Sequence, residues 1–159
     1  MAVYKIADDL DDLSFTLIAI HSILEDYRLA YFLNRELNLG LERLRENIKK
    51  DNQASFSHFE WYDVSIDTYW NLINNKGYKL VQPKSSQGML AFNESNIKVS
   101  LLDTHKQADF LLKIDNGELY NHTEDVLQKI KNIPQVITCY EINTDQLKHK
   151  DQLNFLTNA

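Results

Sequence analysis

Two stretches of the chain decide the fold, and each reads as a strand that leads into a helix. Residues 15–20 have the sequence Phe-Thr-Leu-Ile-Ala-Ile, and residues 109–114 have the sequence Asp-Phe-Leu-Leu-Lys-Ile. Apolar runs of this length, rich in β-branched and aromatic residues, are typical of strands that are buried on both faces. Each run is followed by a helix-like stretch and then by another strand-like run. The repeated pattern predicts two β-α-β units.

The first helix is predicted to follow Ser22 and to end near Leu37. Ser22 and Glu25 have the spacing of a capping box, in which each side chain satisfies a backbone N–H group at the start of a helix. Asn38 is a suitable residue for the end of this helix. On a helical wheel one stripe lies apart from Arg28 and is the predicted buried face. Its members are Ile23, Tyr27, Ala30, Tyr31, Asn34 and Leu37.

The second helix is predicted over residues 123–132. Thr123 is the expected N-cap, and the carboxylates of Glu124 and Asp125 suit the positive end of the helix dipole. Pro134 is expected to end the helix, because a proline disfavours helical geometry in the residue before it. A strand over residues 135–142 completes the second unit.

A β-meander is predicted between the two units. Residues 55–62 and 66–73 are rich in aromatic residues and read as two antiparallel strands around a turn at residues 63–65. Residues 39–48 fit either strand or helix spacing, and a strand over residues 39–45 is the favoured prediction. Further predictions are a turn at 74–77, a loop at 83–88, and short strands at 89–92 and 97–102.

The predicted fold class is therefore α+β, with a mostly antiparallel sheet and two helices on one face. The two β-α-β units resemble the halves of a ferredoxin-like or ACT-like domain. That is a likeness of shape, and shape does not carry function.

Composition predicts a single globular domain over residues 1–159, with an acidic N-terminal segment (1–13) and a polar C-terminal tail (144–159). The formal net charge of −6 argues against binding to nucleic acid or to an anionic membrane surface. The single cysteine, Cys139, rules out an internal disulfide and fits a reducing cytoplasm. No apolar run approaches the roughly 20 residues that would span a bilayer.

The chain contains few patterns that point to catalysis or to a cofactor. Its five histidines are scattered singly, without the spacing of a metal site. His21 stands where a strand meets a helix and could act as a general base with Glu25 or Asp26, but a hydrogen-bonded surface histidine is the alternative. No glycine-rich phosphate loop is present, so no cofactor is predicted.

The aromatic hairpin is the more suggestive surface. Trp61 and Trp70 flank its turn, with Glu60 and Tyr69 beside them. If exposed, these rings would serve a ligand pocket or a dimer seam; the alternative, which we favour, is that they pack under a helix. The candidate binding or interface residues are His21, Arg28, Glu60, Trp61, Tyr69 and Trp70.

Several blocks of the chain resemble the bacterial IPExxxVDY family. They are residues 16–21 with 24–31, residues 59–61 with 70–72, and residues 133–142. The segment 102–114 resembles the stretch that names the family: it keeps the aspartate as Asp109, followed by an aromatic residue, but has Asp103 and Thr104 where the formula has proline and glutamate. The resemblance implies a cytoplasmic bacterial protein and supplies neither an activity nor catalytic residues.

Three functional hypotheses follow. The first is a non-enzymatic regulatory or protein-interaction domain, expected as a homodimer through a sheet edge or an aromatic face, with an unknown protein partner. The second is an ACT-like domain that binds a small molecule near a helix N-terminus or a subunit seam. The third is an enzyme that uses His21 with Glu25 or Asp26.

Overall fold

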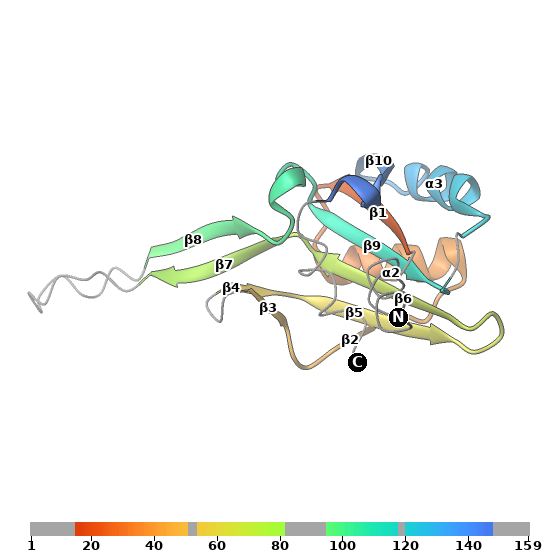
Figure 1. The fold of residues 1–159 in the computed structure, drawn as a ribbon, viewed down its shortest axis with the longest axis horizontal. Helices are drawn as coiled ribbons and strands as arrows, with labels where there is room; N and C mark the ends of the chain where they lie inside the picture. The colour runs from red at the N-terminus through yellow and green to blue at the C-terminus, as the bar shows by residue number, and fades with distance from the viewer. Residues whose placement is uncertain (1–14, 51–53, 82–94, 118–119, 148–159) are drawn as a thin grey trace, which may run out of the picture.

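A six-stranded antiparallel sheet forms the body of the protein in the computed structural model, which describes residues 15–50, 54–81, 95–117 and 120–147. The strand order is β10-β1-β9-β6-β5-β2, and helices α2 and α3 cover one face (Figure 1). The predicted α+β class is confirmed. The bounds are β1 (Thr16–Ser22), α2 (Asp26–Leu37), β2 (Glu42–Arg43), β5 (His58–Asp63), β6 (Thr68–Asn74), β9 (Phe110–Asp115), α3 (Thr123–Lys131) and β10 (Val136–Ile142).

A second, four-stranded sheet has the order β3-β4-β7-β8. Strands β7 and β8 of this sheet form an arm that extends away from the larger sheet (Figure 1). One long hairpin joins the two sheets, because β4 leads into β5 across Ser57 and β6 leads into β7 across Asn75. The bounds are β3 (Ile48–Lys50), β4 (Ala54–Phe56), β7 (Lys76–Val81) and β8 (Ser95–Ser100).

The prediction of a turn at residues 74–77 was wrong, because the chain continues there from one sheet into the next. Asn75 is fully buried, and its side chain links this segment to the loop before β9 instead of forming a turn. Its side-chain oxygen accepts from the Leu102 N–H at 2.9 Å, and its amide nitrogen donates to the Ala108 carbonyl at 2.8 Å. Gly77 is required nearby, since a Cβ at that position would lie 2.4 Å from the Ser55 carbonyl oxygen.

The hairpin turn between β5 and β6 lies slightly later than predicted. β5 runs through Asp63, and β6 begins at Thr68. The predicted loop at residues 83–88, the strand at 89–92, the acidic segment 1–13 and residues 148–159 of the tail lie outside the described ranges.

The predicted capping box at Ser22 was wrong. α2 begins at Asp26, and its N-cap, Glu25, makes no side-chain capping hydrogen bond. The Ser22 hydroxyl instead donates to the Gln135 carbonyl at 2.9 Å and accepts from the Leu24 N–H at 3.1 Å. It therefore fastens the end of β1 to the loop before β10.

The predicted buried face of α2 was also largely wrong. The helix buries Leu29, Ala30 and Leu33, whereas Tyr27 and Tyr31 are exposed. Of the predicted stripe, only Ala30 is fully in the core. Leu29 and Leu33 are one turn apart and sit beneath the helix, which turns the tyrosines outward. The predicted end at Asn38 is confirmed, since this residue has the left-handed conformation, with φ 53°.

The second β-α-β unit is confirmed in outline: β9 and β10 both pair antiparallel with β1, which lies between them, and α3 connects them. α3 ends at Lys131, before Pro134, as predicted. The N-cap is His122 rather than Thr123, whose hydroxyl donates to the Tyr120 carbonyl at 3.0 Å.

The first unit ends differently from the prediction. The strand expected over residues 39–45 is reduced to the two residues of β2, at the far edge of the sheet.

Candidate functional site

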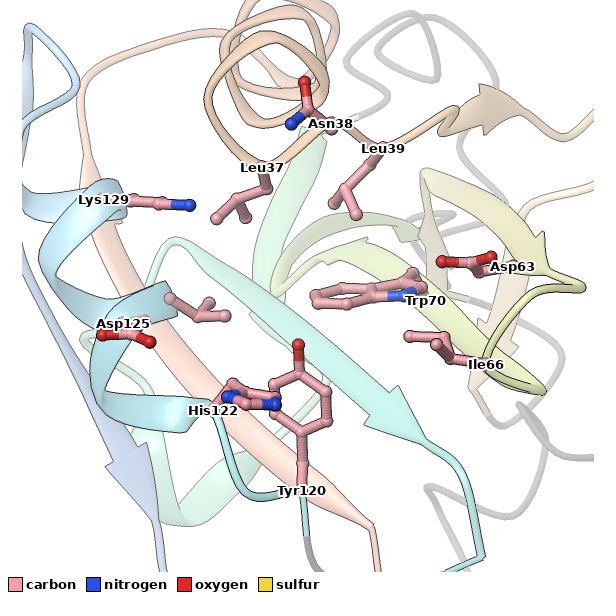
Figure 2. A pocket seen from close by; sticks show the side chains of 11 residues that line it. Leu37, Asn38, Leu39, Asp63, Ile66, Trp70, Tyr120, His122, Asp125 and Lys129 are labelled. Atoms are coloured by element: carbon pink, nitrogen blue, oxygen red, sulfur yellow. The ribbon is translucent and has the colours of Figure 1, made fainter.

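A pocket of about 260 Å³ opens on the helix-covered side of the larger sheet (Figure 2). Its walls are the C-terminal end of α2, the connection before α3 with one side of α3 itself, and the end of the β5–β6 hairpin. Segments far apart in the sequence therefore meet here, which is the usual setting of a small-molecule site.

Local hydrogen bonds explain why the α2 wall is well defined. The left-handed Asn38 ends the helix, and the segment after it turns back along the sheet. The Asn34 side chain holds this segment from both sides, since it accepts from the Leu41 N–H at 2.9 Å and donates to the Leu41 carbonyl at 3.1 Å. Leu37 and Leu39 are thereby presented to the pocket as an apolar wall.

Aromatic rings line the pocket. Trp70 is only 3% exposed, and its indole N–H has no hydrogen-bond partner. Tyr120 meets the indole edge to face at a centroid distance of 5.6 Å, and His122 meets Tyr120 in the same way at 5.8 Å. A buried donor without a partner is uncommon in native proteins, because it loses its hydrogen bond to water.

Charged side chains of both signs complete the lining. Asp63 lies on one side of the pocket, and Asp125 and Lys129 lie across from it on α3 (Figure 2). Lys129 makes no salt bridge with either carboxylate. Burial, with the negative charges of Asp125 and Asp63, raises the pKa of Tyr120, so this phenol stays protonated and can donate.

The opposite face of the sheet holds a second polar group of residues, buried and centred on Lys113. Its ammonium is fully buried, has no hydrogen-bond partner and lies 3.9 Å from an Asp115 carboxylate oxygen. It also lies 4.6 Å from the centre of the Phe15 ring. Burial lowers the pKa of Lys113 to about 8.

Asn71 pairs across the strands with Lys113 on one side and Glu60 on the other. Its side-chain oxygen lies 2.7 Å from Nε2 of His58. Burial, partly offset by this hydrogen bond, lowers the pKa of His58, so the ring is neutral at ordinary pH. One carboxylate oxygen of Glu60 is buried without a partner. These residues lie on the neighbouring strands β5, β6 and β9, and we assign them no reaction.

The structure separates the six candidate residues rather than gathering them. His21 lies on β1 and contacts the Tyr140 hydroxyl at 3.2 Å. Arg28 is exposed on α2 and lines a groove of about 540 Å³ along the N-terminal part of that helix. Glu60 belongs to the opposite-face polar group.

The two tryptophans and Tyr69 divide between the faces of the sheet. Trp70 lines the pocket, and its cross-strand partner Trp61 is half-buried against the helix-side core. The favoured prediction that these rings pack under a helix is thus met. Tyr69 points to the other face, where it is exposed and stacks on Tyr62 at 4.5 Å.

The predicted catalytic pairing of His21 with Glu25 or Asp26 receives no support from the hydrogen bonds of these residues. The Asp26 carboxylate is 2.7 Å from the Tyr27 N–H, and Glu25 is exposed at the N-cap. Burial raises the pKa of the Cys139 thiol, which donates to the Leu127 carbonyl at 3.4 Å. Across the described ranges, no three His, Cys, Asp or Glu residues gather as a metal site would require.

Sequence reasoning found Trp70 but missed the rest of the pocket. Tyr120 and His122 stand in the connection before α3, and Asp63 ends a strand, so each reads as an ordinary loop residue. Asp125 was assigned to the helix dipole alone. Lys113 did carry a signal: it is the lone charge in the five-residue run 110–114, whose other members are apolar, and this is the pattern of a charge that is forced into a sheet.

None of the helices in the described ranges is long and apolar enough to cross a lipid bilayer. Comparison with known proteins finds no matching family model, no similar curated protein and no similar solved structure. Membership of the IPExxxVDY family therefore stays a prediction that rests on the sequence blocks given above.

Proposed function

We propose that this protein is a non-enzymatic interaction domain that forms a homodimer by pairing β10 of one copy with β10 of a second. The observation that carries this proposal is the difference between the two edges of the larger sheet. The β2 edge is only two residues long, whereas the β10 edge is seven residues long.

The β10 edge has only part of the usual protection against pairing, namely a register shift at Ile137 and the exposed charge of Glu141. In the described part of the chain, β10 pairs only with β1, so one side of its backbone is open. Natural proteins blunt such edges with short strands, prolines or lysines. β10 contains neither proline nor lysine, and its side chains Ile137 and Tyr140 are 70% and 38% exposed.

A groove beside the start of β10 adds apolar surface to this edge. Pro134 and Gln135, which directly precede the strand, line it together with Tyr27 and Tyr31 of α2. The two tyrosines are 58% and 60% exposed. Exposed apolar surface of this kind, next to an open edge, favours a protein partner.

A second copy is the partner that suits this surface best. Two identical edge strands can pair antiparallel about a twofold axis, so that the same patch is used on both subunits. The backbone N–H and C=O groups of β10 then gain partners, and the sheet continues from one subunit into the other. The proposal includes the cytoplasmic location predicted from the lone cysteine.

Light scattering during gel filtration tests the proposal. We expect a mass of twice the 18.6 kDa of one chain. Ile137→Lys should give a monomer, because it places a charge on the pairing edge. Val64→Lys is the matched control: this residue is 80% exposed on the β5–β6 turn, and its substitution should leave the dimer intact. A monomeric wild type, or a dimer that survives Ile137→Lys, would contradict the proposal.

A further inference from the structure

The pocket of Figure 2 is separate from the proposed dimer edge. It lies at the C-terminal end of α2, and the groove beside β10 lies along the N-terminal part of the same helix. A helix of 12 residues is about 18 Å long. A ligand in the pocket would therefore leave β10 and its groove accessible.

The strongest sign of a ligand is the indole N–H of Trp70. The residue is almost completely buried and lines the pocket, and its donor has no acceptor in the protein. Burying such a donor is unfavourable unless something accepts its hydrogen bond. An oxygen atom of a bound molecule would remove this cost.

Asp63 supplies the opposite chemistry close to this donor. It pairs with Thr68 across the hairpin, so it is a diagonal neighbour of Trp70 on the same face of the sheet. One of its carboxylate oxygens accepts from both the N–H and the hydroxyl of Ser65, at 3.0 and 2.6 Å. The other oxygen makes no hydrogen bond or salt bridge within the described ranges and can accept from a ligand.

Aromatic rings and a second carboxylate favour a positive charge in the same space. Trp70 and Tyr120 form an edge-to-face pair, and ring faces attract cations. Asp125 lines the other side, so that the pocket contains two carboxylates and a single lysine, Lys129. The formal balance of these three groups is −1, which favours a ligand with an ammonium group.

The start of α3 also favours a ligand that carries a hydrogen-bond acceptor. α3 has nine residues, and the side chain of its N-cap, His122, makes no capping hydrogen bond. The N–H groups of a helix's first turn and its dipole attract anionic oxygens. Donors for a carboxylate and acceptors for an ammonium therefore line one pocket.

We propose that this pocket binds a free α-amino acid. The ammonium group pairs with Asp63 and lies against the rings of Trp70 and Tyr120, and a carboxylate oxygen accepts from the Trp70 N–H. The side chain of the ligand runs along the apolar wall of Leu37 and Leu39. A volume of about 260 Å³ suits a molecule of this size, since pockets for drug-sized ligands measure roughly 300–1,000 Å³.

The first experiment measures thermal unfolding of the full chain with each standard L-amino acid. We expect at least one of them to raise the melting temperature, because a ligand that binds only the folded state stabilises it. The best amino acid is then compared with the amine that lacks its carboxylate and with the acid that lacks its ammonium. Both analogues should bind at least about tenfold more weakly, which corresponds to the loss of one good polar contact.

A pair of matched variants locates the site. Trp70→Phe removes the N–H and keeps an aromatic ring, and it should weaken binding about tenfold by calorimetry. Trp61→Phe is the control, because Trp61 is the cross-strand neighbour of Trp70 and does not line the pocket. In this control Trp70 is the remaining tryptophan, so its fluorescence should change when the amino acid binds.

Asp63→Asn keeps the test decisive if Trp70→Phe does not fold, because it removes the charge that pairs with the ammonium group. Asp67→Asn is the control, since Asp67 lies on the same hairpin, is exposed and does not line the pocket. Asp63→Asn should weaken amino-acid binding, and Asp67→Asn should not. The proposal is overturned if no amino acid stabilises the wild type, if an analogue with one charge binds as well, or if Asp63→Asn binds like Asp67→Asn.

Discussion

The two faces of the larger sheet are buried in different ways. Beneath α2 and α3, the strands contribute apolar side chains such as Ile18, Leu72 and Leu112. On the other face, the same strands contribute Leu17 and Leu111 but also Lys113, Asn71 and His58. Neighbouring residues on one strand, Leu112 and Lys113, thus experience opposite chemistry.

This difference shows that burial and apolarity are separate properties of a strand. The helix face is closed mainly by side chains that need no hydrogen bonds, with the indole N–H of Trp70 as an exception. The opposite face buries an ammonium, an imidazole and a carboxylate oxygen, of which two atoms lack partners. Such groups lower the stability of the folded protein. We therefore expect truncation of an apolar side chain on the helix face to destabilise the protein, and replacement of a buried charge on the other face by an apolar side chain to stabilise it.

The largest effect should come from Leu112→Ala on the helix face. Leu112 is fully buried, and its truncation leaves a cavity between the sheet and the helices. We expect a loss of about 3 kcal/mol in the free energy of unfolding, measured by urea denaturation at pH 7. A loss below about 1 kcal/mol would mean that this face is not tightly packed.

Lys113→Met should act in the opposite direction, with a gain of about 2 kcal/mol at pH 7, because it removes a buried charge and keeps the volume. The lowered pKa gives the gain a specific pH dependence. Between about pH 8 and 10.5 the unfolded wild type holds a proton that the folded protein has lost, so wild-type stability rises with pH.

The advantage of Lys113→Met is therefore full below about pH 8 and shrinks toward pH 10.5. Urea denaturation across this range, for both proteins, measures it. A variant that is less stable than the wild type at pH 7 would show that the ammonium makes a favourable contact.

His58→Gln should give a smaller, acid-side effect. Its lowered pKa means that His58 is neutral in the folded protein and charges on unfolding, so wild-type stability falls as the pH drops below 6.5. Glutamine keeps an N–H donor for Asn71 but does not titrate. The variant should lose less stability between pH 7 and 5, measured by thermal unfolding, and an unchanged acid slope would assign it to other groups.

The same contrast explains what could be predicted from the sequence. The apolar runs at residues 15–20 and 109–114 predicted central strands, and the two helices and the class followed from them. The sequence of a strand that is buried on both faces does not show which elements cover each face. Lys113 was therefore treated as a single polar residue within a buried run. The buried role of Asn75 was hidden for a related reason, because asparagine and glycine together usually mark a turn.

The start of α2 was predicted wrongly, and most of the pocket was missed, for another reason. Ser22 and Glu25 satisfy a local capping pattern, but the Gln135 carbonyl, more than a hundred residues later, competes for the same hydroxyl. The pocket likewise depends on contacts between segments that are far apart in the sequence: α2, α3 and the β5–β6 hairpin. Trp70 was found because aromatic residues attract attention on their own, and Asp63 and Tyr120 were missed because only the fold gives them a role.

The position of β1 in the sheet sets the order in which this chain can fold. In the part of the chain that the structure describes, β1 pairs only with β9 and β10, and its contact between His21 and Tyr140 spans 119 residues. Topologies with such distant pairings fold slowly. At a synthesis rate of roughly 5–20 residues per second, the apolar β1 emerges from the ribosome several seconds before its partners exist. While the chain grows, β1 therefore exposes an apolar run that only much later segments can cover.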